Sequence, residues 1–467
     1  MNRRHYGTLR FAGAALWAVM VIAILAPRAH ALEIKRMTLS NGAVLLVSEE
    51  HKLPMVTVSI AFDAGARRDP AGKAGLAALT ARCLGQGTKE LSAAEFNQKV
   101  DFMGSSVGVS AGRDYAVAGF TSLEKYQGAT LALLTGILVE PGLRDSDIER
   151  KRAETVAEIH AQEEEPGYTA SVAFQKALFG DTPYGHPQDG TADSVAKLTP
   201  ADVRAFYHQY YKLGSAVIAV TGDVRADEVK ASLEKSLTGL SGTVAPQAVP
   251  APPPLAKGLD AKLIDRSVQQ ANIIMGFDGI ARANPDYYKL QVMNYIFGGG
   301  GFASRLVKIV RSENGLAYSI GSVVDAGKFP GAYGIRLQTK NASANEAIKL
   351  ILEQMRAIQQ HGVTDSELEG AKKFLIGSFP LKFDRQSAIA GFMLGIELDR
   401  LGLDYADRYP KLIQAVTRQD VQEMARKYLH PDAILVVAVA NLKDAAINTT
   451  MLSQVAAGDA DAARKKQ

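Results

Sequence analysis

The chain has 467 residues, of which 47% are hydrophobic and 22% are charged, and it contains one cysteine. This length predicts two or more domains with ample cores, and a single cysteine excludes any intrachain disulfide. The formal net charge of +4 comes from four arginines in residues 1–31. The remainder carries 49 basic and 49 acidic side chains, and this balance gives no reason to expect binding to nucleic acid.

Residues 1–31 have the pattern of a secretory signal peptide. Arg3, Arg4 and Arg10 precede an apolar stretch at 11–26, and Ala29-His30-Ala31 forms an A-x-A cleavage site. The apolar stretch is shorter than the roughly 20 residues that span a membrane. We therefore expect a periplasmic protein with no stable membrane span after cleavage; an uncleaved signal that anchors the chain is the alternative.

The first elements of the mature chain are two strands, at 35–39 and 43–48, joined by a turn at Asn41-Gly42. Residues 56–64 alternate as a third strand. Residues 73–88 then place Leu76, Leu79, Cys83 and Leu84 at helical spacing, which predicts a helix with one buried face. Gly85 and Gly87 end this helix.

A second hairpin is predicted at 105–111 and 115–121, followed by helices at 123–138 and 146–165. Ser146-x-x-Glu149 has the pattern of a capping box at the start of the second helix, which Pro166 ends.

A proline-rich segment at 246–254 predicts an extended linker, because proline interrupts both sheet and helix. The sequences on its two sides are alike: Ser146-x-x-Glu149 matches Ser366-x-x-Glu369, and 198–211 matches 416–429. Each of these matches begins with a capping box, and apolar strands at 216–221 and 434–440 follow the second one. The sequence therefore predicts halves at 32–245 and 259–445, each with about six strands, joined by a linker at 246–258 and followed by a tail at 446–467.

The second half contains four consecutive glycines at 298–301. They lack the lysine and the spacing of a phosphate-binding loop, so nucleotide binding is not expected. A helix is predicted at 304–312, with Leu306, Ile309 and Val310 facing inward, and 315–319 leads into a strand.

The helix at 73–88 resembles the one that carries H-x-x-E-H in the insulinase/pitrilysin metallopeptidases, or inverzincins. The shared frame is G-L-A-H-x-x-E-H-x-L-x-x-G-T. By this resemblance, the first metal histidine falls on Ala78, the general-base glutamate on Ala81 and the second metal histidine on Arg82. Alanine has no donor atom and arginine is a permanent cation, so the resemblance implies a degenerate member without catalytic residues. The alternative is an ordinary core helix.

The resemblance also implies an α+β fold, in which two homologous halves form a clamshell like that of mitochondrial processing peptidase. It places the third metal ligand on Glu158, a remnant without partners, and a substrate-contacting pair on Arg311 and Tyr318. By the same resemblance, a peptide would add to the edge strand at 105–111, which from the residues alone is equally a plain strand. From the residues alone, Glu158 is a solvated helix glutamate, Arg311 a surface arginine in a salt bridge and Tyr318 a tyrosine packed in a sheet.

These features predict a non-catalytic, substrate-binding subunit of an exported peptidase. Its partner would be a homologous subunit that carries H-x-x-E-H and the zinc ion, since no metal is expected in this chain. The alternatives are a non-proteolytic structural or assembly protein of the same fold, and an active zinc endopeptidase with unrecognised ligands.

Overall fold

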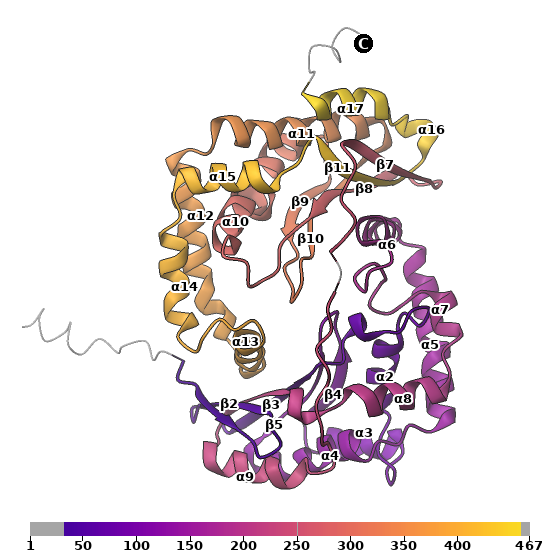
Figure 1. Cartoon of the computed structure of the whole chain (residues 1–467), viewed down its shortest axis with the longest axis vertical. Coiled ribbons are helices and arrows are strands. Elements are labelled where there is room, and N and C mark those ends of the chain that lie inside the picture. Colours follow the sequence, from indigo (N-terminus) through magenta and orange to yellow (C-terminus); the bar gives the residue numbers. More distant parts are fainter. Residues whose placement is uncertain (1–31, 250, 459–467) are drawn as a thin grey trace, which may run out of the picture.

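The computed structural model describes residues 32–249 and 251–458 and shows two α+β halves, one above the other (Figure 1). The predicted signal peptide lies outside these residues. No helix within the described ranges is long and apolar enough to cross a membrane. The α+β clamshell with two similar halves is confirmed.

The first half is built on a six-stranded sheet with the order β1-β2-β6-β3-β5-β4. All neighbouring strands are antiparallel except β2 and β6. The strands are β1 (Lys35–Thr38), β2 (Val44–Glu49), β3 (Met55–Phe62), β4 (Ser106–Ala111), β5 (Ala116–Leu123) and β6 (Val217–Gly222). The predicted hairpins and strands are present, and β4 lies at the edge.

The second half repeats this order without a counterpart of β1, so it has five strands where about six were expected. Its sheet has the order β7-β11-β8-β10-β9, again with one parallel pair, β7 and β11. The proline-rich segment leads directly into β7, and proline cannot donate to a strand ladder. The strands are β7 (Gly258–Asp265), β8 (Gln270–Asp278), β9 (Ser319–Val324), β10 (Ala332–Lys340) and β11 (Ala433–Ala440).

Helices cover both faces of each sheet. Those of the first half are α2 (Leu76–Leu84), α3 (Ala93–Phe102), α4 (Gln127–Val139), α5 (Asp145–Glu163), α6 (Pro166–Phe179), α7 (Ala192–Ala196), α8 (Pro200–Tyr210) and α9 (Ala226–Ser236). Those of the second half are α10 (Tyr287–Asn294), α11 (Ala344–His361), α12 (Asp365–Ser378), α13 (Gln386–Leu398), α14 (Tyr405–Gln414), α15 (Arg418–Tyr428), α16 (Leu442–Ala445) and α17 (Thr449–Ala457).

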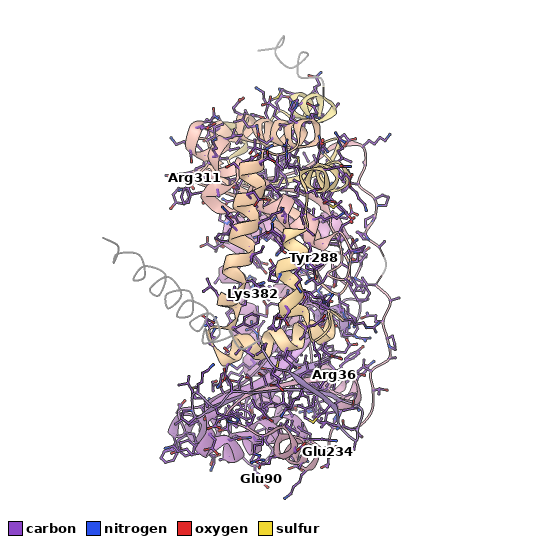
Figure 2. All side chains as sticks on the ribbon, turned by 90° about the vertical axis from the view of Figure 1, so that its left-hand side faces the viewer. Arg36, Glu90, Glu234, Tyr288, Arg311 and Lys382 are labelled. Atoms are coloured by element: carbon purple, nitrogen blue, oxygen red, sulfur yellow. The ribbon has the colours of Figure 1, made fainter. Side chains whose placement is uncertain are left out.

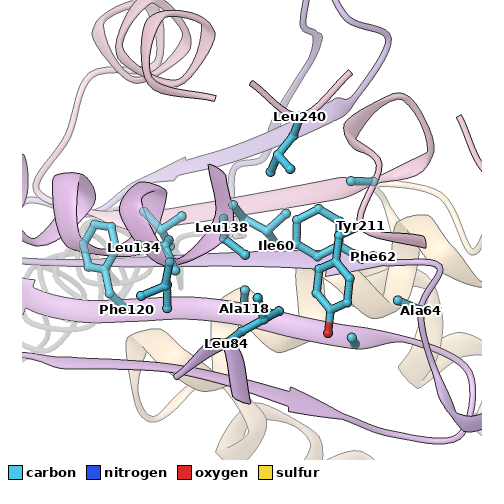
Figure 3. Packing of buried hydrophobic residues seen from close by; sticks show 14 of the residues in the cluster. Ile60, Phe62, Ala64, Leu84, Ala118, Phe120, Leu134, Leu138, Tyr211 and Leu240 are labelled. Carbon is cyan, nitrogen blue, oxygen red and sulfur yellow. The ribbon is translucent and has the colours of Figure 1, made fainter. Parts of the chain in front are cut away.

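The core of the first half lies between its sheet and the helices α2, α4 and α8. Figure 3 shows Ile60 of β3 beside Leu138 of α4, and Phe62 of β3 beside Tyr211, which follows α8. These side chains are at most 1% exposed, as the alternation of the strands and the apolar faces of the helices predict.

The two halves exchange one helix each, and both helices lie between the sheets (Figure 1). Helix α6 of the first half packs on β8 and β11, where Phe174 meets Ile274 and Val437. Helix α13 of the second half packs on β3 and β6, where Met393 lies beside Ala219. The exchange buries two apolar clusters at the junction and so holds the halves together.

The capping boxes predicted at Thr199 and Thr417 are present, each closed by an aspartate three residues later. The box predicted at Ser146 was wrong, because α5 begins at Asp145 and no side chain caps it. In the second half the box belongs to Thr364 and Glu367 rather than to Ser366. Serine at these two positions already lies inside the helix.

The linker forms neither helix nor strand in its described residues and lies against the first half. Gln247 accepts a hydrogen bond of 2.7 Å from Arg67, a side chain that is fully buried. The turn between β9 and β10 also reaches the first half, since Arg113 lies 2.5 Å from Asp325. Charged contacts thus join the linker and both halves.

Candidate functional site

The degenerate site is built on α2, whose start is fixed by a buried carboxylate. Asp69 accepts hydrogen bonds of 2.7 Å from the backbone N–H groups of Gly75 and Ala77. Burial raises the pKa of Asp69 to about 7, although these hydrogen bonds favour its ionised form. Gly75 has a φ of 91°, and a side chain there would come within 2.5 Å of the carbonyl of Asp189. Glycine is therefore required where α2 meets the loop that carries Asp189.

The three positions that would carry the metal chemistry lie together on α2. Ala78 and Ala81 are 4% and 1% exposed, and neither offers a donor atom. Arg82 extends from the same helix to Glu158 on α5, with which it forms an ion pair. Its second terminal nitrogen lies 3.1 Å from Asp189. A three-membered charge cluster thus occupies the place that the resemblance assigns to metal ligands.

This arrangement does not fit a zinc ion. Zinc requires three protein ligands with lone pairs, whereas here a guanidinium stands between the two carboxylates. Burial opposes the charge of Arg82, but its contacts with Glu158 and Asp189 raise its pKa, so it stays cationic. No group of three or more His, Cys, Asp or Glu side chains within the described ranges could hold a metal.

The sequence placed Glu158 at this site but did not identify Asp189. Asp189 lies 107 residues beyond Arg82, in a loop. No spacing rule links a loop residue to a distant helix, so only the folded structure brings this carboxylate to the cluster.

The second predicted feature, Arg311 and Tyr318, lies on the other half. Arg311 is exposed, and its guanidinium lies 5.1 Å from the centre of the Phe302 ring. Figure 2 shows Arg311 at the margin of the second half, on the side away from the linker. Tyr318 precedes β9 and is 70% exposed, while its backbone N–H donates to Gln338. Neither side chain has a hydrogen bond or ion pair to the residues that the structure describes, so both are open to a ligand.

The helical segment that carries Arg311 differs from its predicted form. Residues Val307–Glu313 form a π-helix, a rare form that often occurs at functional sites. Its wider turn buries Val307, whereas Ile309, expected inside, is only half-buried. The buried positions Leu306 and Val310 agree with the prediction.

A salt bridge fixes the start of this segment. Arg305 lies 2.6 Å from Glu367 on α12, and it also donates a hydrogen bond of 3.0 Å to the carbonyl of Gly362. Burial opposes the ionisation of Glu367, but the hydrogen bond from Arg305 lowers its pKa to about 2. This pair therefore helps to hold the segment that presents Arg311.

The Arg305–Glu367 pair predicts a pH-dependent contribution to stability. Because the folded-state pKa of Glu367 is lowered, the contribution is present above its usual pKa and is lost as the pH falls toward about 2. We expect Glu367→Gln to reduce the free energy of unfolding by about 1 kcal/mol at neutral pH, a modest value because the pair is partly solvated. The difference should shrink progressively between about pH 5 and about pH 2 in urea unfolding. Glu353→Gln on α11 is the control, because Glu353 has no ion pair among the described residues. An equal effect of both variants at every pH would contradict this assignment.

Comparisons with known proteins agree on one family for both halves. The model described as "Insulinase (Peptidase family M16)" matches residues 44–191, and the one described as "Peptidase M16 inactive domain" matches residues 197–375. The non-peptidase homolog YmxG of Helicobacter pylori is 26% identical over 85% of this chain and 92% of its own. An uncharacterized zinc protease of Streptomyces coelicolor is 26% identical over 85% of this chain and 87% of its own.

Solved structures show the same fold. The peptidase M16 inactive domain from Pseudomonas fluorescens superposes with a TM-score of 0.82, at 28% identity, over 88% of this chain and 98% of the other. A chain of complex III2 from Candida albicans superposes with a TM-score of 0.78, at 17% identity, over 91% of this chain and 100% of the other.

Proposed function

The chain belongs to the insulinase (M16) peptidase family, and from this premise we propose that it is a non-catalytic, substrate-binding subunit of an exported zinc metallopeptidase. The observation that carries this proposal is the ion cluster of Arg82, Glu158 and Asp189. A permanent cation replaces a metal ligand, and it is held there by the glutamate that the resemblance identifies as the third ligand. The cluster supports the loss of metal chemistry in this half.

The exposed pair of Arg311 and Tyr318 supports a role in substrate binding. A guanidinium presents forked donors to a peptide carbonyl or carboxylate, and a phenol adds one directional donor. The two groups would stabilise the negative charge that develops on the carbonyl oxygen as the peptide bond is attacked. The attacking chemistry would come from a homologous partner subunit that carries H-x-x-E-H and zinc.

The proposed location is the periplasm, on the basis of the signal-peptide pattern in residues 1–31. An anchor formed by an uncleaved signal is the alternative. In either case the substrate would be a peptide outside the cytoplasm.

A second candidate function is a structural or assembly role. It is favoured by the fold shared with a chain of complex III2. Such a role needs no substrate contact, so Arg311 and Tyr318 would then be dispensable. The two functions can therefore be separated by substitution at these positions.

The pairing can be tested by coexpressing this chain with an H-x-x-E-H-bearing relative from the same genome. We expect the two chains to elute together in gel filtration. We also expect the mixture to hydrolyse unfolded casein at least about tenfold faster than either chain alone, because the two chains carry complementary parts of the site.

The control is the same mixture with the glutamate of the partner's motif replaced by glutamine, which should be inactive yet still paired. The proposal fails if the relative alone is as active as the mixture, or if the two chains do not associate.

A further inference from the structure

The inner face of the second sheet is only partly covered by a helix. Helix α6 packs on β8 and β11, where Phe174 meets Ile274. Strands β10 and β9 extend the sheet beyond α6, with β9 at the edge. Since α6 lies between the two sheets, this face is turned toward the space between the halves (Figure 1).

The uncovered part of this face forms a shallow strip of two strands, which we call the inner strip. Its residues follow from the strand register: Arg336 pairs with Ile274 on one side and with Gly321 on the other, so all three share a face. The next pairs along β10 and β9 join Gly334 with Val323 and Gln338 with Ser319. The inner strip therefore consists of Ser319, Gly321, Val323, Gly334, Arg336 and Gln338.

The inner strip has small or exposed side chains and open space above them. A Cβ added at Gly334 would meet no atom within 4 Å. Val323 is 52% exposed, although it is apolar. Two cavities adjoin the strip: one of about 520 Å³ is lined by Tyr168, Asn272 and Gln338, and one of about 110 Å³ includes Arg336. Side chains that can hydrogen-bond, such as those of Arg336 and Gln338, thus border open space along the strip.

Arg336 is the single cation of the inner strip. It is exposed, and it forms no hydrogen bond or ion pair with any residue in 32–249 or 251–458. Asp325 and Arg113 line the same small cavity, but they form an ion pair with each other at 2.5 Å. The Arg336 guanidinium, which has Gly321 as its neighbour on β9, is therefore suited to bind a carboxylate in a bidentate manner.

The first half shows that the fold does not require an arginine at this place. A Phe-Asp sequence marks the end of the corresponding strands: β3 ends at Phe62, which Asp63 follows, and β8 ends with Phe277-Asp278. The residue three positions before the phenylalanine is Ser59 in β3 and Ile274 in β8. Ser59 pairs with Gly119 of β5, whereas Ile274 pairs with Arg336 of β10. Glycine therefore occupies the position in the first half that arginine occupies in the second.

We propose that the inner strip binds an extended peptide segment and that Arg336 holds a carboxylate of that peptide. Glycines at 321 and 334 let the peptide backbone approach, while Gln338 and Asn272 offer amide hydrogen bonds. The carboxylate is an acidic side chain or the C-terminus of the peptide. This inference rests on the proposed peptide-binding function and adds a preference for acidic substrates.

The test measures binding of fluorescent eight-residue peptides of alternating valine and serine to the full chain without a partner. One peptide has a central glutamate and an amidated end, one has a central glutamine and a free carboxyl end, and one has neither charge. The wild type should bind at least one charged peptide about tenfold more tightly than the neutral one, and Arg336→Gln should abolish that difference. The two charged peptides show which carboxylate is bound.

Two further variants separate binding from folding and net charge. Gly334→Val adds a side chain where there is space, so it should fold normally but weaken binding of all three peptides. Arg225→Gln removes an exposed arginine of the first half and should bind like the wild type. The proposal is overturned if the wild type binds no peptide, if Arg336→Gln binds like Arg225→Gln, or if Gly334→Val folds and binds normally. Partner-dependent hydrolysis is not part of this assay, so a failure here leaves the pairing of subunits to be judged separately.

Discussion

Replacing Arg311 by alanine is expected to reduce peptide hydrolysis by the reconstituted pair of subunits about 100-fold, while the pair still assembles. The reason is that Arg311 is exposed and unpaired among the described residues, so its guanidinium is free to act on substrate. Loss of one donor to a developing oxyanion typically costs about 100- to 1,000-fold in turnover. Tyr318→Phe removes only the hydroxyl and should reduce turnover by about tenfold or more, because a neutral donor contributes less.

The control for this series is Lys308→Ala. Lys308 lies on the same π-helix and is exposed, but it points toward Glu313, at 4.0 Å. Loss of this lysine should leave turnover unchanged. Turnover that is unaffected by Arg311→Ala would remove the substrate role and favour the structural or assembly function. A loss of assembly in gel filtration would instead make Arg311 an interface residue.

A second large effect is expected from restoring the metal motif. In the triple variant A78H/A81E/R82H, removal of the guanidinium frees Glu158 from its ion pair. The helix then presents two histidines to a carboxylate that already lies next to position 82, which completes a zinc ligand set. We expect the variant to bind about one equivalent of zinc, measured by metal analysis after dialysis, whereas the wild type binds none.

The same variant with Glu158→Gln provides the control. Its affinity for zinc should be at least about tenfold lower than that of the triple variant. Loss of a hydrogen bond that only supports a ligand already costs about tenfold in metal affinity, and here a ligand itself is lost. A folded triple variant that takes up no zinc would show that the site has diverged beyond the three positions on α2. Circular dichroism checks folding, because Ala78 and Ala81 are buried and larger side chains there need the space that Arg82 vacates.

The sequence was informative where local chemistry sets the structure. Alternating strands with turn residues predicted β3, β4 and β5, and the helical spacing of Leu76, Leu79 and Cys83 predicted the buried face of α2. The family frame then placed Ala78, Ala81 and Arg82 on that helix, and the observed contact between Arg82 and Glu158 agrees with the spacing.

Features that depend on tertiary contacts could not be predicted in this way. Asp189 joins the charge cluster through a loop far along the chain. The π-helical turn at Val307–Glu313 changes which side chains face inward, and single-sequence periodicity assumes a regular α-helix. The significance of Arg336 emerges only when the strand register places it on the inner face, between Ile274 and Gly321.

We propose that this chain has no catalytic metal site of its own. The most direct measurement is the zinc content of the purified full chain, determined together with its hydrolysis of unfolded casein in zinc-containing buffer. We predict less than about one-tenth of an equivalent of zinc and no hydrolysis above the background without protein, because the cluster of Arg82, Glu158 and Asp189 cannot bind the ion. One equivalent of zinc accompanied by turnover of the isolated chain would contradict this account.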